Sequence, residues 1–189
     1  MTATEAVFHV LFLDFDGVLN SADWLRRRPS KIEWAAKLGI SEEEFTHDRM
    51  NWALRSFDPD AVQVLNTIIH KTQARVVMSS TWRTMYPLNR LQMMLRYHGF
   101  DHHLLGATPD GSEMRAQGGY GTFVTRGQEI SAWLALLPSS LEVRWVVIDD
   151  ELVPGHEDRL CQTDVEVGLC AADIPRIIET LFKKVEHPR

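Results

Sequence analysis

The fold is decided by the stretch Val10-Leu11-Phe12-Leu13-Asp14-Phe15-Asp16-Gly17-Val18-Leu19-Asn20. A continuous apolar run leads into two carboxylates, Asp14 and Asp16, and then into Gly17. Such a run is typical of a strand that is buried on both faces of a parallel sheet. Aspartates at the end of a buried strand cost free energy unless a cation or hydrogen-bond donors compensate them, and glycine permits a sharp turn there. The stretch therefore indicates either a strand with an ordinary Asp-rich turn or the start of a functional site.

The chain of 189 residues has the size of one domain, 1–189, with room for a modest insertion. Its net charge of -6 gives no support for general attraction to nucleic acid or anionic membranes, although a local basic patch stays open. Cys161 and Cys170 fit neither a metal motif nor a disulfide framework, so we expect reduced thiols in a cytoplasmic protein. Residues 1–6 lack the basic stretch of a secretory signal. No apolar run approaches the roughly 20 residues that span a bilayer, so no membrane association is predicted, and no obligate protein partner can be inferred.

Strand and helix patterns alternate along the chain. Apolar runs predict strands at 7–14, 75–80, 104–108 and 143–148, with one more within 160–167. Helical periodicity and end signals predict helices that start at Asp58-Pro59, span 87–97, start at Thr125 and span 174–185. This alternation favours an α/β domain with a mainly parallel sheet.

A long segment, 21–57, separates the first strand from the helix that starts at Asp58-Pro59. Ser41 and Glu44 have the spacing of a capping box, and the apolar positions of 31–57 predict one or two helices. The segment is too long for an ordinary loop. We therefore expect a small helical cap, or lid, over the end of the first strand, with at least some of its tryptophans in a core. The basic cluster from Arg26 to Lys31 is interpreted either as a solvated face or as an anion-binding rim.

A second irregular segment, 112–121, is rich in glycine, and we expect a mobile loop there. It lacks the G-x-x-x-x-G-K-[ST] pattern, which argues against an NTPase of that class.

Polar residues follow the predicted strands where each one ends. Because the carboxyl ends of parallel strands share one edge of the sheet, we expect these side chains to converge: Asp14, Asp16, Ser79, Ser80, Asp149 and Asp150. Arg126 lies in the first turn of a helix with a capping box at Thr125 and Gln128; it either faces solvent or answers an anion bound at that helix end. Four carboxylates need a cation, and Mg²⁺ fits an oxygen site that also holds phosphate. The set predicts a phosphoryl-transfer site in which a carboxylate can be the nucleophile.

Four motifs, in this order, resemble those of haloacid dehalogenase (HAD) superfamily phosphatases. Residues 13–19 resemble the D-x-D-G motif, 76–79 the second motif, Arg126 the Lys or Arg of the third motif, and 147–150 the adjacent acids of the fourth. More closely, Ser-Ser-Thr-Trp-Arg at 79–83, Arg-Gly-Gln-Glu-Ile from Arg126 and Ile-Asp-Asp-Glu from 148 are similar to the HAD domains of Swiss Army Knife RNA-repair proteins. The resemblance covers 7–151 and implies a Rossmann-like three-layer sandwich with a small helical cap insertion.

The resemblance also implies roles for single residues. Asp14 would attack phosphorus and form an aspartyl-phosphate, while Asp16 would protonate the leaving group and then activate water. The implied phosphate ligands are Ser79, Ser80 and Arg126. The implied Mg²⁺ ligands are Asp14, the backbone carbonyl of Asp16, Asp149 and Asp150, with the choice between direct and water-mediated binding left open for the last two. The expected reaction is Mg²⁺-dependent hydrolysis of a phosphomonoester on a phosphorylated small molecule, a nucleotide or a nucleic-acid end.

Two other interpretations are kept beside this one. A catalytically silent module that holds phosphorylated ends for a partner would bind phosphate without turnover, and the four intact motifs argue against it. A phosphoacceptor receiver domain also combines acids, a hydroxyl and a cation, but its acidic pair follows the first strand, whereas here a second acidic pair follows the fourth. His98, His102 and His103 lack the spacing of a zinc motif, so no metal site is predicted there.

Overall fold

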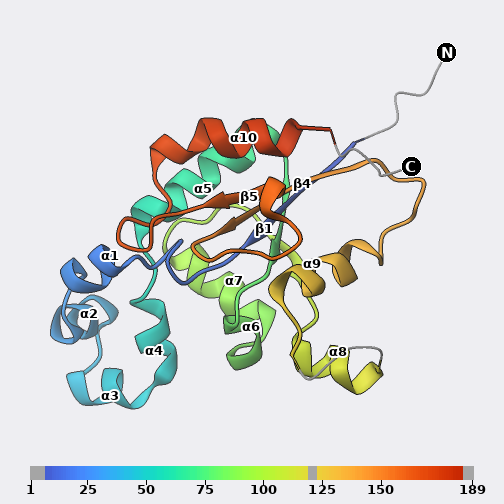
Figure 1. Cartoon of the computed structure of the whole chain (residues 1–189). Coiled ribbons are helices and arrows are strands. Elements are labelled where there is room, and N and C mark those ends of the chain that lie inside the picture. Colours follow the sequence, from blue (N-terminus) through green and yellow to red (C-terminus); the bar gives the residue numbers. More distant parts are fainter. Residues whose placement is uncertain (1–6, 119–122, 185–189) are drawn as a thin grey trace.

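Figure 1 shows the computed structural model of the chain, which describes residues 7–118 and 123–184. Within these residues five strands form one sheet, and all pair in parallel in the order β3-β2-β1-β4-β5. Their bounds are β1 Phe8–Leu13, β2 Arg75–Met78, β3 Leu104–Ala107, β4 Val143–Asp149 and β5 Leu160–Gln162. The predicted α/β fold with a parallel sheet is confirmed, and the fifth strand occupies only the first part of its predicted range.

The helices of the same ranges are α1 Ala22–Arg27, α2 Lys31–Leu38, α3 Glu42–His47, α4 Arg49–Leu54, α5 Pro59–Thr72, α6 Trp82–Met85, α7 Leu88–Tyr97, α8 Gly111–Gln117, α9 Arg126–Leu134 and α10 Ile174–Phe182. Short 3-10 helices cover Glu157–Arg159 and Ala171–Asp173. The capping boxes predicted at Ser41 and Thr125 are both present.

The expected mobile loop at 112–121 is wrong where the structure describes it. Most of it belongs to α8, because Asp110 and Glu113 form a capping box that satisfies the free amides of the first helical turn. Residues 119–121 of that prediction lie outside the described residues.

Helices cover both faces of the sheet, as a three-layer arrangement requires. On one face α5, α7 and α10 pack over a core that includes Leu13, Met78 and Ile148. On the other face Ile130 of α9 packs with Phe12 and others in a second, smaller core. Figure 1 shows α5 and α10 together on one side of the strands and α9 on the other. Alternate residues of β1 enter the two cores, which explains its uninterrupted apolar sequence.

The long segment between β1 and α5 forms four short helices, α1 to α4. Three of them lie in 31–57, where one or two were predicted. Trp34 is buried with Phe45 in a small core of this segment, as expected for some of its tryptophans, whereas Trp52 is 49% exposed. The Trp34 ring also lies 5.5 Å from the ring of Tyr97 at the end of α7.

A buried histidine fastens the same segment to the end of α7. The Nε2 atom of His98 lies 2.6 Å from the backbone oxygen of Leu54 in the segment. Burial lowers the pKa of His98, so the neutral ring is the favoured form. The neutral ring with its proton on Nε2 donates to this carbonyl. This bond joins residues 44 positions apart and attaches the segment, close to its carboxyl end, to the end of α7.

Two further features are the lengths of the apolar helices and the state of the cysteines. Across 7–118 and 123–184, no helix is both long enough and apolar enough to cross a membrane. Cys161 and Cys170 are both free thiols.

Candidate active site

Three neighbouring strands bring predicted site residues to one edge of the sheet. Asp14 follows β1, Ser79 follows β2, and Asp149 is the last residue of β4. Backbone bonds fix their relative heights, because the Asp14 amide donates to the Ile148 oxygen at 3.0 Å and the Ser79 amide donates to the Leu13 oxygen at 2.9 Å. Since β1 lies between β2 and β4, Asp14 occupies the middle of this row.

Asp14, Asp149 and Asp150 form a compact group of carboxylates. One possible ligand oxygen from each lies within 4.8 Å of those from the other two. Arg126, the first residue of α9, places Nη1 3.0 Å from Asp14 Oδ1 and 2.8 Å from Asp149 Oδ2. The Arg126 guanidinium therefore binds the protein's own carboxylates. Its single positive charge stands against three acids.

The pKa values reflect this crowding of buried acids. Burial, followed by the charge of Asp14, raises the pKa of Asp149 to about 7. The same two causes raise the pKa of Asp150. Burial alone would lower the pKa of Arg126, but the charges of Asp14 and Asp149 outweigh it and the net direction is upward. Arg126 thus stays charged, while Asp149 takes up a proton near neutral pH unless another cation joins the group.

The residues present fit a divalent cation. Three carboxylates offer the oxygen ligands that Mg²⁺ prefers. Asp14 Oδ1 is buried and accepts no hydrogen bond from any described residue, although the Arg126 guanidinium is near it. An unsatisfied buried acceptor is costly, and a cation held by these acids would satisfy it and offset the excess negative charge.

The Asp16 side chain lies beside this group rather than in it. Its Oδ1 accepts from Asn20 Nδ2 at 2.6 Å, and its two oxygens lie 3.1 and 3.0 Å from the Nε1 donor of Trp82. Asp16 is exposed, whereas Trp82 is buried. Two donors therefore fix the orientation of a carboxylate that faces solvent next to the buried acids. The role predicted for the Asp16 backbone carbonyl as a metal ligand stays a prediction.

The two serines after β2 are both buried, but their hydroxyls differ. Ser80 Oγ accepts from the Trp82 amide at 3.4 Å, at the start of α6. Ser79 Oγ is buried and makes no hydrogen bond within the described ranges. Of the two serines, Ser79 therefore has the hydroxyl that is free to bond a ligand at this edge, while Ser80 supports the following turn.

Two glycines let backbone segments approach the site closely. Gly17 has a φ of +64°, and a Cβ atom there would lie 2.3 Å from Asp150 Cγ. Gly127 follows Arg126 in α9, and a Cβ atom there would lie 2.0 Å from the backbone oxygen of Pro154. Gly17 thus allows the turn after β1 to contact Asp150, and Gly127 allows the start of α9 to pack against the loop after β4.

Gly127→Ala is expected to destabilise the protein by about 1–3 kcal/mol, as overpacked sites typically do. Alanine in place of glycine within a helix usually stabilises by up to about 1 kcal/mol, but here the methyl group meets a backbone oxygen. Thermal unfolding measures the difference. Gly106→Ala is the matched control, because no atom lies within 4 Å of its added Cβ. Equal unfolding temperatures for the two variants would contradict the close packing at Gly127.

A buried ion pair connects α6 to α9. Arg83 Nη2 lies 2.6 Å from Glu129 Oε2, and their side chains are 9% and 12% exposed. Arg83 Nη1 also donates to the backbone oxygens of Ser79 and Ser80, at 3.0 and 2.6 Å. Burial raises the pKa of Glu129, and the charge of Arg83 opposes that shift. Arg83 therefore fixes both the serine turn and the helix that begins with Arg126.

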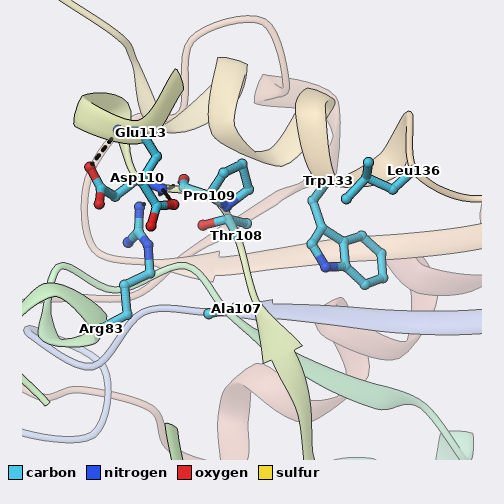
Figure 2. Close-up of a pocket in the computed structure, with 8 residues that line it drawn as sticks. All are labelled: Arg83, Ala107, Thr108, Pro109, Asp110, Glu113, Trp133 and Leu136. Atoms are coloured by element: carbon cyan, nitrogen blue, oxygen red, sulfur yellow. Dashed lines mark hydrogen bonds between the residues drawn. The ribbon is translucent and has the colours of Figure 1, made fainter. Parts of the chain in front are cut away.

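A cavity of about 400 Å³ lies beside this ion pair. Figure 2 shows Arg83 pointing toward Asp110 and Glu113, with Trp133 and Leu136 at the other end of the cavity. Two carboxylates at its edge disfavour a second phosphate group there. The cavity is separate from the group formed by Asp14, Asp149 and Asp150.

Two members of the basic cluster after β1, Arg26 and Arg27, pair with neighbouring acids, whereas Arg28 bonds the Arg55 carbonyl and the Ser56 hydroxyl. Arg26 lies 2.6 Å from Glu166, and Arg27 lies 2.7 Å from Asp58. These pairs favour the interpretation as a solvated face over that as an anion-binding rim.

The residues that hold the site residues in place lie near the sequence motifs, but the sequence did not predict what they do. Asn20, Trp82 and Arg83 all lie within or next to the quoted motifs. Asn20 bonds Asp16 only four residues away, whereas Trp82 and Arg83 also contact groups that only the fold brings near. Trp82 is 66 residues from Asp16, and Glu129 meets Arg83 from a different helix. Spacing along the chain does not show such contacts.

One protein-family model matches residues 10–174, which is most of the chain. Its description is "HAD domain in Swiss Army Knife RNA repair proteins". The match runs from within β1 to the first residue of α10, so it includes every segment that builds the site. No curated protein and no solved structure matches the chain.

Proposed function

Because the chain belongs to the HAD domains of Swiss Army Knife RNA-repair proteins, we propose that it is a Mg²⁺-dependent phosphomonoesterase. Membership of this family suggests a hydrolase of the phosphatase type. The observation that supports the proposal most is the group formed by Asp14, Asp149 and Asp150. Arg126 forms ion pairs with two of these acids, Asp14 and Asp149. Bound Mg²⁺ would offset the charge that a phosphate group adds to these acids.

In the proposed mechanism Asp14 is the nucleophile. Its carboxylate forms a bond to phosphorus while the bond from phosphorus to the leaving oxygen breaks, which gives an aspartyl-phosphate. Asp16 gives its proton to the leaving oxygen and then accepts a proton from the water that hydrolyses the intermediate. Asn20 and Trp82 keep the Asp16 carboxyl group oriented for both steps.

The proposed phosphate ligands are the Ser79 hydroxyl and the Arg126 guanidinium. Ser79 Oγ lacks another partner among the described residues, and Arg126 combines a fixed charge with several donors. Ser80 was predicted beside them, and its contact with the start of α6 supports an indirect role for it.

Hydrolysis of p-nitrophenyl phosphate, with Mg²⁺ and with EDTA, tests the proposed activity. Turnover that requires the metal supports a phosphatase. Phosphate-dependent binding without turnover of any phosphomonoester would instead favour the silent binding module.

Stabilisation by Mg²⁺ is expected to be larger at pH 8 than at pH 6. In the metal-free protein the pKa of Asp149 is raised to about 7, so the folded state binds more protons than the unfolded chain between about pH 4 and pH 7, and stability falls as pH rises through that window. Mg²⁺ binds only the ionised carboxylate. At a concentration of about 100 times its Kd it adds about 2.7 kcal/mol, which thermal unfolding detects. If Mg²⁺ raised the unfolding temperature equally at both pH values, Asp149 would not be the titrating ligand. The same holds if Mg²⁺ stabilised Asp149→Asn as much as the native chain.

For the substrate we propose a nucleotide or a phosphorylated nucleic-acid end. The exposed ring of Trp52 lies 6.3 Å from the ring of Trp82, and the two planes differ by 17°. Trp82 in turn donates to Asp16, the proposed acid for the leaving group. Trp52 is therefore one ring away from the residue that bonds Asp16. An exposed indole in that position is suited to stack on the base of a bound nucleotide. Trp52 lies on α4, and α1 to α4 form the proposed cap.

The free thiols support a cytoplasmic location.

Trp52→Ala is expected to raise KM for a nucleoside monophosphate by about 5- to 150-fold, the equivalent of about 1–3 kcal/mol per stacked base. Hydrolysis of β-glycerophosphate, which has no ring, should not change. Trp52→Phe should retain most of the binding, and Phe182→Ala, on α10, serves as a control for the loss of an exposed aromatic ring. Equal losses for both substrates would contradict stacking while leaving the phosphatase assignment intact. A panel of 3′- and 5′-phosphorylated RNA and DNA then identifies the preferred end.

A further inference from the structure

A second group of potential metal ligands lies away from the proposed active site. His70 is in the last turn of α5, and Asp101 and His102 are in the loop between α7 and β3. This group lies near the amino ends of β2 and β3, because α5 ends just before β2 and the loop leads directly into β3. Asp14 follows the carboxyl end of β1, so the two groups occupy opposite edges of the sheet.

The three side chains converge on one point. His70 Nε2 lies 2.9 Å from Asp101 Oδ2, and His102 Nε2 lies 3.0 Å from Asp101 Oδ1. The two imidazole rings have centroids 4.7 Å apart. All three possible ligand atoms lie within 4.8 Å of one another. Ligand atoms about 2.0–2.2 Å from one tetrahedral ion are separated by about 3.3 Å, so a small adjustment suffices for a shared ion.

Hydrogen bonding does not account for the position of His102. Its Nε2 atom is buried and makes no hydrogen bond to a described residue, even though Asp101 is close. In the neutral tautomer with its proton on Nδ1, the Nε2 lone pair faces a carboxylate oxygen 3.0 Å away, which is unfavourable. A metal ion bound by both atoms removes that conflict.

We propose that His70, Asp101 and His102 bind a Zn²⁺ ion, with the fourth position open to water. Two imidazole nitrogens and one carboxylate oxygen suit zinc and related late transition metals, whereas Mg²⁺ selects sites made of oxygen. The ion would join the end of α5 to the loop before β3 and would stabilise the folded state through its binding free energy. The spacing of His98, His102 and His103 did not predict this site, because one ligand comes from residue 70, on an earlier helix.

Titration of the metal-free protein with Zn²⁺ tests the site, by calorimetry and by competition with a coloured chelator. Mg²⁺ is present in large excess throughout, so that it competes with Zn²⁺ for the group around Asp14. The expected result is one Zn²⁺ per chain. His70→Ala and Asp101→Asn should each weaken binding by about tenfold or more, since replacing even a residue that only orients a ligand typically costs that much.

The matched control is His103→Ala, which removes a neighbouring histidine that contacts Arg96 instead of the group. It should bind Zn²⁺ as the native chain does. All three substituted positions are exposed, and thermal unfolding without metal verifies that each variant is folded. Zn²⁺ should raise the unfolding temperature of the native chain and of His103→Ala but not of His70→Ala. Absence of Zn²⁺ binding at micromolar concentration, or equal affinity for His70→Ala and the native chain, would overturn the proposal.

Discussion

Asp14→Asn is expected to abolish Mg²⁺-dependent hydrolysis of p-nitrophenyl phosphate, with kcat lowered by about 10³-fold or more, as for the loss of other catalytic nucleophiles. The amide is a poor nucleophile, so the aspartyl-phosphate cannot form, and its uncharged carbonyl oxygen is a weaker ligand for the cation than the carboxylate. The change preserves shape, and it removes one of three crowded acids around Arg126. The folded state should therefore be at least as stable as that of the native chain in the absence of metal.

Steady-state kinetics and thermal unfolding together check this expectation. Asp158→Asn is the matched control, because its carboxylate is 63% exposed and lies just before β5, at the other end of that strand from the site. It should retain native turnover. Activity that survives in Asp14→Asn would mean that another residue is the nucleophile, whereas unfolding of the variant would mean that Asp14 has a structural role.

Arg83→Met is expected to destabilise the protein by about 3–5 kcal/mol, the usual cost of leaving a buried charge without its partner. Glu129 would remain buried and unpaired, and the backbone oxygens of Ser79 and Ser80 would lose a donor. For a chain of this length the loss corresponds to a decrease in Tm of about 10 °C. Activity should also fall, because the same guanidinium holds the serine turn.

The double variant Arg83→Met with Glu129→Leu separates charge from packing. It removes both members of the pair, so it should be more stable than Arg83→Met alone. Arg90→Met, at an exposed position of α7, should have little effect. If the double variant were as unstable as the single one, the loss would come from the backbone contacts of Arg83 rather than from the isolated charge of Glu129.

Features that depend on neighbouring residues were predictable from the sequence. The apolar run of β1 follows from burial on both faces, and the capping box at Thr125 depends on a spacing of three residues. The convergence of Asp14 with Asp149 and Asp150 also followed, because parallel strands put their carboxyl ends at one edge. These rules use periodicity and topology alone.

Features that depend on distant side chains were not predictable. Arg83 resembles a surface residue in sequence, and only its contact with Glu129 of another helix explains its burial. The exposure of Trp52 beside the buried Trp82 depends on how α4 packs, which its few apolar positions do not determine. At 111–117 the glycines that follow favour a loop, whereas the capping box of Asp110 and Glu113 stabilises a helix there.

The attachment of the segment α1–α4 to α7 affects how a substrate reaches Asp14. A cap that swings on a hinge admits only molecules that fit inside after closure, and each turnover then includes opening and closing steps. Here the Trp34–Tyr97 ring contact and the hydrogen bond from His98 to Leu54 join the segment to α7, so a swinging motion of the segment would have to break both contacts. For the proposed phosphatase, a polymer end could then enter and leave the site while the remainder of the polymer stays in solvent. Release of a long product would not wait for the segment to open.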